Sequence, residues 1–493
     1  MKKLIFVILA AGLFAGTGLF AQSEDDLFSG SDDELFSTSD DDLFGASDDD
    51  LFGGDGIEVV EDVQAKTDLS KGTLFENGSI KIGGNFSTSL STSTVLYSEA
   101  ENSFGDNLKN TKLTPTASAF LSVDARPTQV LRMYTKFGIA YPYTVYATTL
   151  SSTDVYQTVN NSFLALTSSS TTVFDWFKLK ELFTDFSIAD RAFFRFGLHT
   201  VTWGTGYFFS PVSDLINTSS INPEDTSAQV EGSLNLRTQI TFPDSQNCLW
   251  LYVIPSTNFT NTTTAESYVR DTALAGKFDL VLGGWEFGLG AFWKYETAPK
   301  AMLTMSGSLK NLSIFGEFVY RYGANSEWSS NTNWDNKTSI FQASVGISRY
   351  WKDQAIMLAL QYYFDGNYVD KLFEGSYTYN GFPVTISVPS LTKGHNVALA
   401  LNFGRLFGTT DLTASIFAMA NFGKDELSPL ARSYLNSSGY SSFFNTMTIS
   451  GMLNYSPVSA LTIGMGPYLT WETYENKPTV SLKLTATLGG GKF

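Results

Sequence analysis

Apolar and polar residues alternate with a period of two in one segment after another from residue 78 to the end of the chain. Successive side chains of a β-strand point to opposite faces, so this pattern predicts strands with one apolar and one polar face. In the segment 273–282, for example, Leu274, Phe278, Leu280 and Leu282 share one face. Four further segments show the pattern as clearly: 116–126, 130–141, 396–404 and 479–488.

The length and polarity of these segments favour a membrane barrel over a soluble β-sandwich, which also alternates. Strands of soluble proteins usually have about five or six residues, whereas a tilted strand needs about 9–11 to cross a membrane. The polar faces hold mostly Ser, Thr, Asn and Gly and few charges, as the lumen of a barrel would. We therefore predict an all-β protein, a transmembrane antiparallel β-barrel over residues 78–493.

Turn and loop signals divide this region into eighteen predicted strands, near 78–92, 115–126, 129–142, 179–189, 192–203, 229–243, 247–256, 271–282, 285–296, 299–310, 312–324, 338–350, 354–366, 394–404, 410–423, 443–456, 459–472 and 478–490. Sixteen strands remain an alternative, because the first strand and the short link at 297–298 are weakly marked. Eighteen strands enclose an aqueous channel unless loops fold into it.

The connections alternate between short and, mostly, long. The short ones include 125–128, 189–191, 283–284, 310–311 and 456–459, and the long ones include 143–178, 204–228, 257–270, 324–337, 367–393 and 424–442. Bacterial barrels have an even number of strands, tight turns in the periplasm and long loops outside. The pattern therefore predicts a cell outer membrane location with both termini in the periplasm.

The N-terminus carries an export signal. Lys2 and Lys3 precede an apolar run over 4–13, and small residues lead to Ala21, so residues 1–21 are expected to be a cleaved signal peptide. Residues 22–62 form an acidic tail, and 63–77 a linker or short plug. No later stretch of eighteen apolar residues predicts a membrane-spanning helix.

Aromatic residues make up 15% of the chain and gather where predicted strands meet the two membrane interfaces, at Tyr141, Trp293, Tyr350 and Trp351, for example. Aromatic girdles at these levels are typical of outer-membrane barrels. The chain also ends on an aromatic residue, Phe493, which partly matches the terminal signal that barrel-assembly machinery recognises. Outer-membrane lipid and this machinery are the expected partners.

The net charge of −17 is concentrated in the tail, which holds sixteen acidic residues and no Lys or Arg. Leaving out these sixteen and the two signal lysines, 33 acidic and 30 basic residues remain, a net charge of −3. The barrel region is thus nearly neutral, and nothing indicates a nucleic-acid partner. The single cysteine, Cys248, cannot form a disulfide within the chain.

The tail contains four octads, each with Ser, three acidic residues, Leu and Phe, that begin at 23, 31, 39 and 47. Segments of this composition cannot build a core and are expected to be disordered. They are either a solvated spacer or a multivalent ligand for a periplasmic partner, with Phe28, Phe36, Phe44 and Phe52 as anchors. Calcium chelation is less well supported, because calcium loops alternate their ligands.

One motif is distinctive: Phe194 to Gly204, then Tyr207 to Pro211, then Ile221 to Asp225. It resembles an Arg-x-Gly…Trp-Gly…Phe…Asn-Pro-x-Asp pattern in porin-like barrels of the alginate-export type, and the whole chain resembles spirochaetal outer-membrane barrels. The resemblance implies an eighteen-stranded pore that conducts an acidic polysaccharide. From the strand phase, we expect Arg195, Gly197 and His199 to face the lumen. The loop with Pro211 would then fold inward as a constriction.

The other lumen-phase charges have mixed signs. They either pair and stiffen the wall or form a selectivity filter. The pore-lining candidates are Arg132, Lys136, Arg195, His199, Glu231, Arg237, Lys277, Glu317 and Arg321.

Only two histidines, His199 and His395, are present, and no catalytic cluster, metal-binding spacing or phosphate-binding loop is recognisable. We therefore expect no enzyme and no cofactor. The predicted function is a porin-like channel for passive or facilitated diffusion of small solutes. Two alternatives remain, an adhesin or structural barrel that uses its long outer loops, and an import barrel for hydrophobic molecules plugged by its N-terminal segment.

The constant phase of the octads generates the first testable prediction. Changing Phe28, Phe36, Phe44 and Phe52 to Ser should abolish co-purification of a periplasmic partner, while the barrel still folds and conducts. A single change should weaken binding only in part, because the remaining copies keep the effective concentration high. If the fourfold variant retains every partner, the tail is a spacer. If deletion of 23–52 blocks assembly or conduction, the tail belongs to the barrel.

Overall fold

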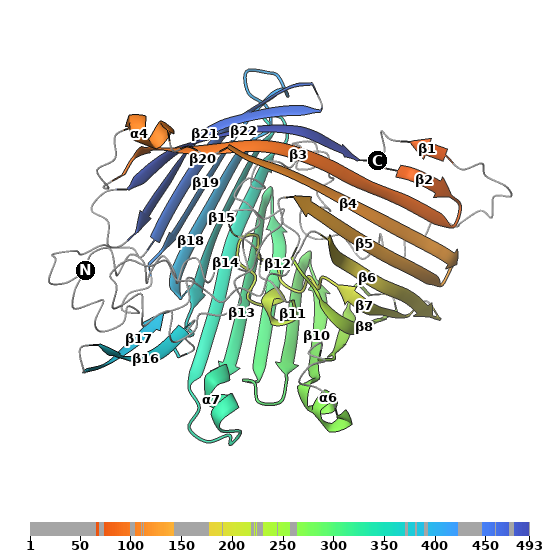
Figure 1. Ribbon diagram of the computed structural model, residues 1–493. Helices are drawn as coiled ribbons and strands as arrows, with labels where there is room; N and C mark the ends of the chain where they lie inside the picture. The colour runs from red at the N-terminus through yellow and green to blue at the C-terminus, as the bar shows by residue number, and fades with distance from the viewer. Residues whose placement is uncertain are drawn as a thin grey trace.

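The structure, a computed structural model, describes residues 66–68, 73–98, 104–109, 111, 113–141, 177–189, 191–217, 221, 223, 230–243, 245–256, 264–369, 373–379, 382–388, 393–422, 446–458, 460–472 and 478–492 (Figure 1). The predicted signal peptide and the acidic tail with its four Phe anchors lie outside the described residues. So do residues 143–176 of the predicted outer loop 143–178 and the terminal Phe493.

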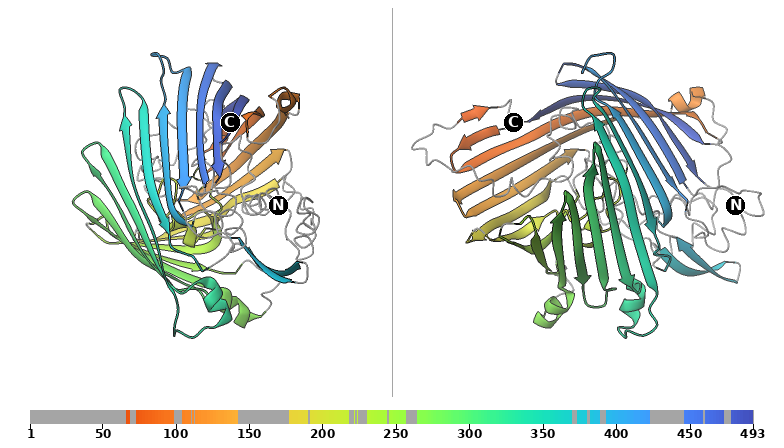
Figure 2. Two further views of the ribbon diagram at one scale, coloured as in Figure 1. Left: turned by 90° about the vertical axis from the view of Figure 1, so that its left-hand side faces the viewer. Right: turned by 180° about the vertical axis from the view of Figure 1, so that it is seen from behind.

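Eighteen antiparallel strands form a closed ring (Figures 1 and 2). They are β3 (Ile80–Tyr97), β4 (Leu113–Thr128), β5 (Leu131–Tyr141), β6 (Phe177–Ile188), β7 (Ala192–His199), β8 (Ser233–Thr241), β9 (Cys248–Ile254), β10 (Ala273–Leu282), β11 (Trp285–Trp293), β12 (Lys300–Leu309), β13 (Leu312–Tyr322), β14 (Ser339–Trp351), β15 (Ile356–Asp365), β18 (Gly394–Phe403), β19 (Leu412–Asn421), β20 (Thr446–Val458), β21 (Leu461–Glu472) and β22 (Thr479–Lys492).

The last strand closes the ring by pairing with the first. Leu488 of β22 lies opposite Thr88 of β3, and Leu482 lies opposite Thr94. Each of the eighteen strands corresponds to one predicted strand, so the prediction of an eighteen-stranded barrel is confirmed and the sixteen-stranded alternative is wrong. The count follows from local signals, because every turn between strands has its own Gly, Asn or polar cluster.

A short hairpin extends the wall beyond the end of β22. Strand β1 (Lys66–Asp68) pairs with β2 (Thr73–Asn77), and β2 pairs with the first residues of β3, Ile80 to Gly83. Strand β22 pairs with the same edge of β3 only from Asn85 onward. In the region expected to be a linker or short plug, the described residues therefore continue the sheet.

The long connections all lie at one end of the barrel and the short turns at the other, because consecutive strands are antiparallel. The long ones carry the helices α4 (Phe104–Lys109), α6 (Ala265–Asp271) and α7 (Asn325–Ser330), and the hairpin of β16 (Phe373–Tyr379) and β17 (Phe382–Val388) (Figure 1). None of the described helices is long and apolar enough to span a membrane.

The polarity of the wall is the reverse of that in a soluble protein. On β10, Leu274, Phe278 and Leu280 are exposed on the outside, whereas Lys277 and Asp279 are buried on the inside. The same alternation continues around the ring, so the exposed outer surface is a broad apolar belt. A continuous apolar surface of this kind is suited to contact with lipid, and it defines a transmembrane barrel.

Candidate functional site

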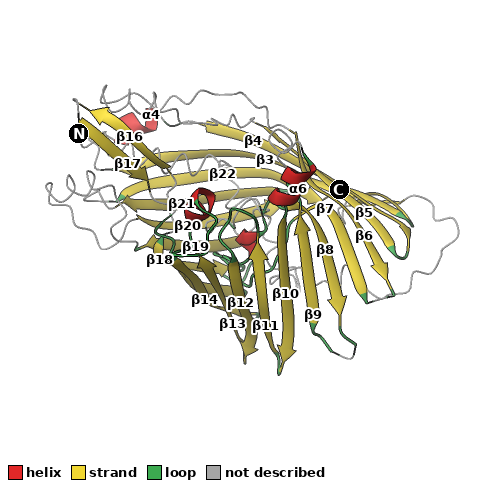
Figure 3. Ribbon diagram, turned by 90° about the horizontal axis from the view of Figure 1, so that it is seen from below, coloured by secondary structure: helices red, strands yellow, loops and turns green. Residues whose placement is uncertain are grey.

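Residues 200–217, called the inner segment from here on, leave the wall after β7 and fold into the barrel interior. The predicted strand over 192–203 is therefore wrong beyond His199, whereas the inward fold of the following loop agrees with expectation. The inner segment contains a single turn of 3₁₀ helix, η3 (Ser213–Leu215). Seen from below, loop segments gather inside the ring of strands (Figure 3).

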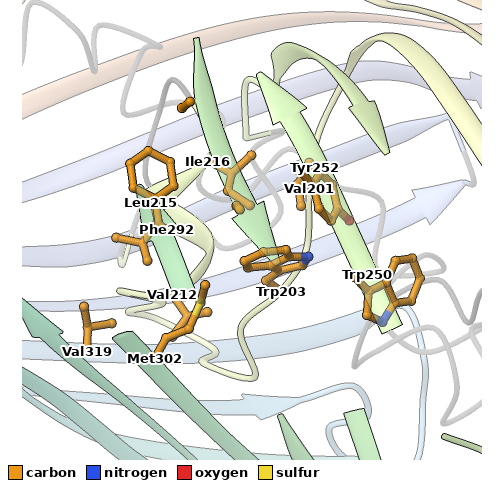
Figure 4. Packing of buried hydrophobic residues seen from close by; sticks show 12 residues of the cluster. Val201, Trp203, Val212, Leu215, Ile216, Trp250, Tyr252, Phe292, Met302 and Val319 are labelled. Atoms are coloured by element: carbon orange, nitrogen blue, oxygen red, sulfur yellow. The ribbon is translucent and has the colours of Figure 1, made fainter. Parts of the chain in front are cut away.

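One part of the inner segment packs against inward-facing apolar residues of β9 to β13 (Figure 4). The indole of Trp203 meets the ring of Tyr252 edge-on, with the ring centroids 4.8 Å apart. The whole cluster consists of Val201, Trp203, Val212, Leu215 and Ile216 of the segment and Trp250, Tyr252, Ala273, Ala275, Phe292, Met302 and Val319 of the wall. The inner segment therefore shields the apolar residues on this side of the inner wall from the lumen.

A second apolar cluster joins the middle of the inner segment to β15, β18 and β19. The ring of Phe209 stacks on Tyr363 with the ring centroids 5.1 Å apart. The ring centroids of Phe208 and Phe417 are 5.9 Å apart. Met357, Ala359, Ala398 and Ala400 complete the cluster. Burial of large side chains on both sides fixes the segment in one position, because interiors of this kind are closely packed.

Glu317 of β13 anchors the inner segment through four hydrogen bonds. Its carboxylate accepts from the backbone N–H groups of Thr205 (2.6 Å), Gly206 (2.6 Å) and Val212 (3.0 Å). It also accepts from the Ser210 hydroxyl, 2.9 Å away. Hydrogen bonds to a charged acceptor are the stronger ones, and here they also satisfy a carboxylate that is only 3% exposed.

Two further wall residues hold the segment. The Gln361 side chain of β15 accepts from the N–H groups of Phe208 (2.7 Å) and Phe209 (3.2 Å), and donates to the carbonyl of Phe209 (2.7 Å). The Lys277 ammonium of β10 donates to the carbonyl of Trp203 at 3.1 Å and lies 2.9 Å from Asp279. The segment is thus tied to three separate strands.

Two glycines of the distinctive motif are required by geometry. Gly197 of β7 has a φ of +142°, a conformation that other residues rarely adopt. At Gly204 a Cβ atom would collide with the Ser210 hydroxyl and the Glu317 carboxylate. The Trp-Gly pair of the motif therefore combines an apolar anchor with the close approach that Glu317 needs. Of the Asn-Pro-x-Asp part, only Pro223 is among the described residues.

The arginines of β5 and β7 form ion pairs across neighbouring strands. Arg195 binds Asp185 of β6 with both ends of its guanidinium, at 2.6 and 3.0 Å. Arg132 binds Asp124 of β4 at 3.0 and 3.1 Å and also lies 3.7 Å from Asp185. Of the two roles considered for the lumen charges, this geometry favours wall stiffening for Arg132 and Arg195.

Four other candidates lie against aromatic or charged neighbours on the inside of the barrel. The Arg237 guanidinium lies 5.2 Å from the Trp250 ring, and Lys136 lies 5.4 Å from the Phe120 ring. His199 is 1% exposed and packs edge-on against Phe183.

Glu231, just before β8, binds Lys178 and Lys180. Burial raises the pKa of the Glu231 carboxyl, but the hydrogen bond from Lys178 and the two lysine charges lower it more, so its pKa lies below the ordinary value. Glu231 thus keeps its charge and pairs with the lysines of β6.

The last three candidates divide into two groups. Lys277 and Glu317 are buried beneath the inner segment and bind it, so they face the segment instead of open lumen. Arg321 of β13 is only partly buried and forms no ion pair among the described residues. Across the same described residues, no group of three or more His, Cys, Asp or Glu side chains is placed to hold a metal ion.

Two important residues were not predicted. Asp185 lies directly opposite Arg195 in the β6–β7 hairpin, so pairing the two predicted strands through their short turn would have found it. Gln361 carries no such signal, because it is one polar residue among many on the inner face of β15. Its role depends on the inner segment, which lies more than 140 residues away in the chain.

The closed ring, the apolar outer belt and the polar interior define the class as a transmembrane β-barrel of the outer-membrane type. No protein family and no curated protein matches the chain. Similar solved structures include OccK2 (OpdF) of Pseudomonas aeruginosa in complex with glucuronate, at TM-score 0.45 and 8% identity over 83% of this chain and 97% of that one.

OccAB2 of Acinetobacter baumannii has a TM-score of 0.43 at 7% identity, with the same coverage of 83% and 97%. OmpF of Salmonella typhi in complex with daunomycin has a TM-score of 0.39 at 9% identity, again over 83% and 97%. All three scores are below 0.5, so the fold assignment stands on the strand pairings described above.

The four hydrogen bonds of Glu317 generate a prediction. Changing Glu317 to Gln replaces an acceptor oxygen with an amide donor, which leaves at least one buried N–H unsatisfied. The cost should be about 1–3 kcal/mol of stability. The inner segment should detach more readily, and single-channel conductance should rise or fluctuate.

The matched control is Glu286→Gln on β11, an inward carboxylate whose side chain is 44% exposed and 4.0 Å from Lys277. Thermal unfolding in detergent and conductance in a planar bilayer would be measured for both variants. Parent-like values for both variants in both assays would show that Glu317 does not hold the segment.

Proposed function

We propose that this protein is an outer-membrane channel for passive or facilitated diffusion of small solutes, and that the inner segment narrows its lumen. The observation that carries the proposal is the inner segment itself, fixed inside a closed ring of eighteen strands by Glu317, Gln361 and Lys277. A wall-bound inward loop reduces the cross-section of a barrel that would otherwise be wide. Solute size and charge would then be selected beside this segment.

The wall charges favour small solutes over a long polyanion. The resemblance to alginate-export-type barrels implies an acidic polysaccharide, which needs a row of unpaired cations. Here Arg132 and Arg195 are bound to Asp124 and Asp185, which leaves that part of the wall with little net positive charge. We therefore propose a porin-like channel for small solutes. We also propose that it belongs to the spirochaetal-type group of outer-membrane barrels.

The primary experiment is single-channel recording of the purified protein in a planar bilayer. Discrete conductance steps are expected. Silent insertion of a folded barrel would contradict the channel and would favour an adhesin or structural barrel.

We also propose that the short-turn end of the barrel faces the periplasm, together with both termini. The first residues of β3 and the last residues of β22, which lead to the two termini, lie at the short-turn end. Epitope tags at Gly283 or Asn311 should be inaccessible to antibody on intact cells, while protease should cleave within the long connections 143–178 or 367–393. A tag at Gly283 that is stained on intact cells would invert the orientation.

Arg321 provides the test of charge selection. Arg321→Glu should shift the reversal potential toward cation preference, because a charge beside a narrow passage biases which ions occupy it. The control Lys352→Glu makes the same charge change at an exposed position in the β14–β15 turn and should leave the reversal potential unchanged. An unchanged potential in Arg321→Glu would remove Arg321 from the pathway.

Arg195→Glu should behave differently from Arg321→Glu. It places a second carboxylate beside the buried Asp185, and breaking a buried pair typically costs about 3–5 kcal/mol. The expected result is a lower folded yield and a lower unfolding temperature, measured by the heat-dependent gel mobility of the barrel. Normal stability combined with a shifted reversal potential would instead identify Arg195 as a pore-lining charge.

A further inference from the structure

A row of polar side chains crosses the inner wall just inside the end that carries the long connections. Lys300 of β12 lies directly opposite Arg321 of β13, and Gln342 of β14 lies directly opposite Asp365 of β15. All four share the inward phase of their strands. The two pairs are offset by two residues, because Arg321 lies opposite Ile340 of β14 and Gln342 lies opposite Val319 of β13. The row is therefore diagonal: it begins with two cations and ends at Asp365, on which the charge of Lys393 also acts.

The cationic end of the row places two like charges opposite each other on neighbouring strands. Like charges directly opposite each other on neighbouring strands are destabilising, and Lys300 and Arg321 form such a pair. The Lys300 ammonium lies 4.7 Å from the Phe292 ring. Arg321 forms no ion pair among the described residues, and its buried Nε has no hydrogen-bond partner there. An anionic group bound here would give the buried Nε of Arg321 a hydrogen-bond partner.

The acidic end of the row has a hydrogen-bond acceptor without a partner. The Gln342 amide donates to the Tyr363 hydroxyl (2.9 Å) and to Asp365 (3.1 Å). Its carbonyl oxygen Oε1 is buried and has no partner in the described part of the chain. A buried acceptor in this state requires a donor from water or from a ligand.

The inner segment borders the same place. Phe209 stacks on Tyr363, and Asp214 of η3 is close enough, like Asp365 and Arg321, for its charge to act on the Tyr363 hydroxyl. A solute that enters from the long-connection end would therefore meet both cations and carboxylates near Gln342 before it reaches the inner segment.

We propose that this row is a binding site for small zwitterions of the α-amino acid class. The solute carboxylate binds the Arg321 guanidinium, and its ammonium donates to Gln342 Oε1 on the side of Asp365 and Asp214. Arg321 lies opposite Ile340, two residues from Gln342 along β14, so Arg321 and Gln342 are diagonal neighbours on adjacent strands, about 7–8 Å apart. One small molecule with a hydrogen bond at each end can bridge this span. Asp365 lies 3.1 Å from the Gln342 amide, so its carboxylate favours an ammonium over a hydroxyl as the donor, although Lys393 also acts on Asp365.

The inference rests on the proposed channel function, and the experiment separates the two. Proteoliposomes with the full chain would be tested for permeation of L-alanine, L-lactate and 1,2-propanediol, three solutes of similar size. We expect alanine to permeate severalfold faster than propanediol, and faster than lactate. Arg321→Gln should remove most of this advantage, because it takes away the charge-assisted hydrogen bond to the solute carboxylate. Gln342→Leu should reduce alanine permeation more than lactate permeation.

Three further variants complete the design. Arg321→Lys keeps the charge without the planar fork and should retain part of the alanine advantage, which separates loss of binding from a folding defect. Lys352→Gln, in the short β14–β15 turn, removes a cation outside the row and should behave as the parent. Phe407→Ser, at a residue 96% exposed in another short turn, controls for substitution itself.

The outcomes are distinct. Equal permeation of alanine and propanediol through the parent, or an alanine advantage that survives in Arg321→Gln, would overturn the binding site. Lactate that permeates as fast as alanine would overturn the assignment of the donor to an ammonium. If none of the three solutes permeates and no conductance is seen, the proposed channel function itself fails.

Discussion

Satisfaction of backbone hydrogen bonds within a closed ring is the constraint on which the rest of the structure depends. In lipid no water pairs with an exposed N–H or C=O group, so a sheet survives only if its first and last strands meet. Here β22 meets β3 along most of its length, from Val480 to Lys492. Closure by eighteen strands also sets the width of the interior. The inner segment fills part of that interior, and the inward-facing side chains of the candidate site line it.

The inner segment solves a packing problem that the ring creates. Inward-facing Trp250, Phe292, Met302 and Val319 would be unfavourable in contact with a water-filled lumen. The segment covers them with Trp203 and its neighbours, and its backbone polar groups are bound by Glu317 and Gln361. Apolar packing and charge-assisted hydrogen bonds therefore act on the same residues. This combination explains why a loop can be held in a fixed position inside a barrel.

The lumen charges are divided between structural and open positions by strand pairing. Asp185 lies between Arg132 and Arg195 and neutralises part of the charge of both, so this part of the wall is stiffened. Arg321 lies beside Lys300 and has no described carboxylate as an ion-pair partner. A charge without an ion-pair partner among the described residues remains available to a solute, and on this difference Arg321 is proposed as a selectivity position.

The sequence by itself determined where the eighteen strands lie and which face each turns outward, because period-two alternation and turn residues are local signals. It left sixteen strands as an alternative, which the closed ring excluded. It misplaced the end of β7, since Val201 and Trp203 continue the lumen phase of that strand as if the wall went on. Only the tertiary structure showed that these side chains meet Trp250 and Met302, far away in the chain. It also decided that Lys277 and Glu317 hold the inner segment, while Arg321 forms no ion pair with any residue that the structure describes. The reason is physical: a charge's role depends on its partners, and those partners are brought together only when the ring closes.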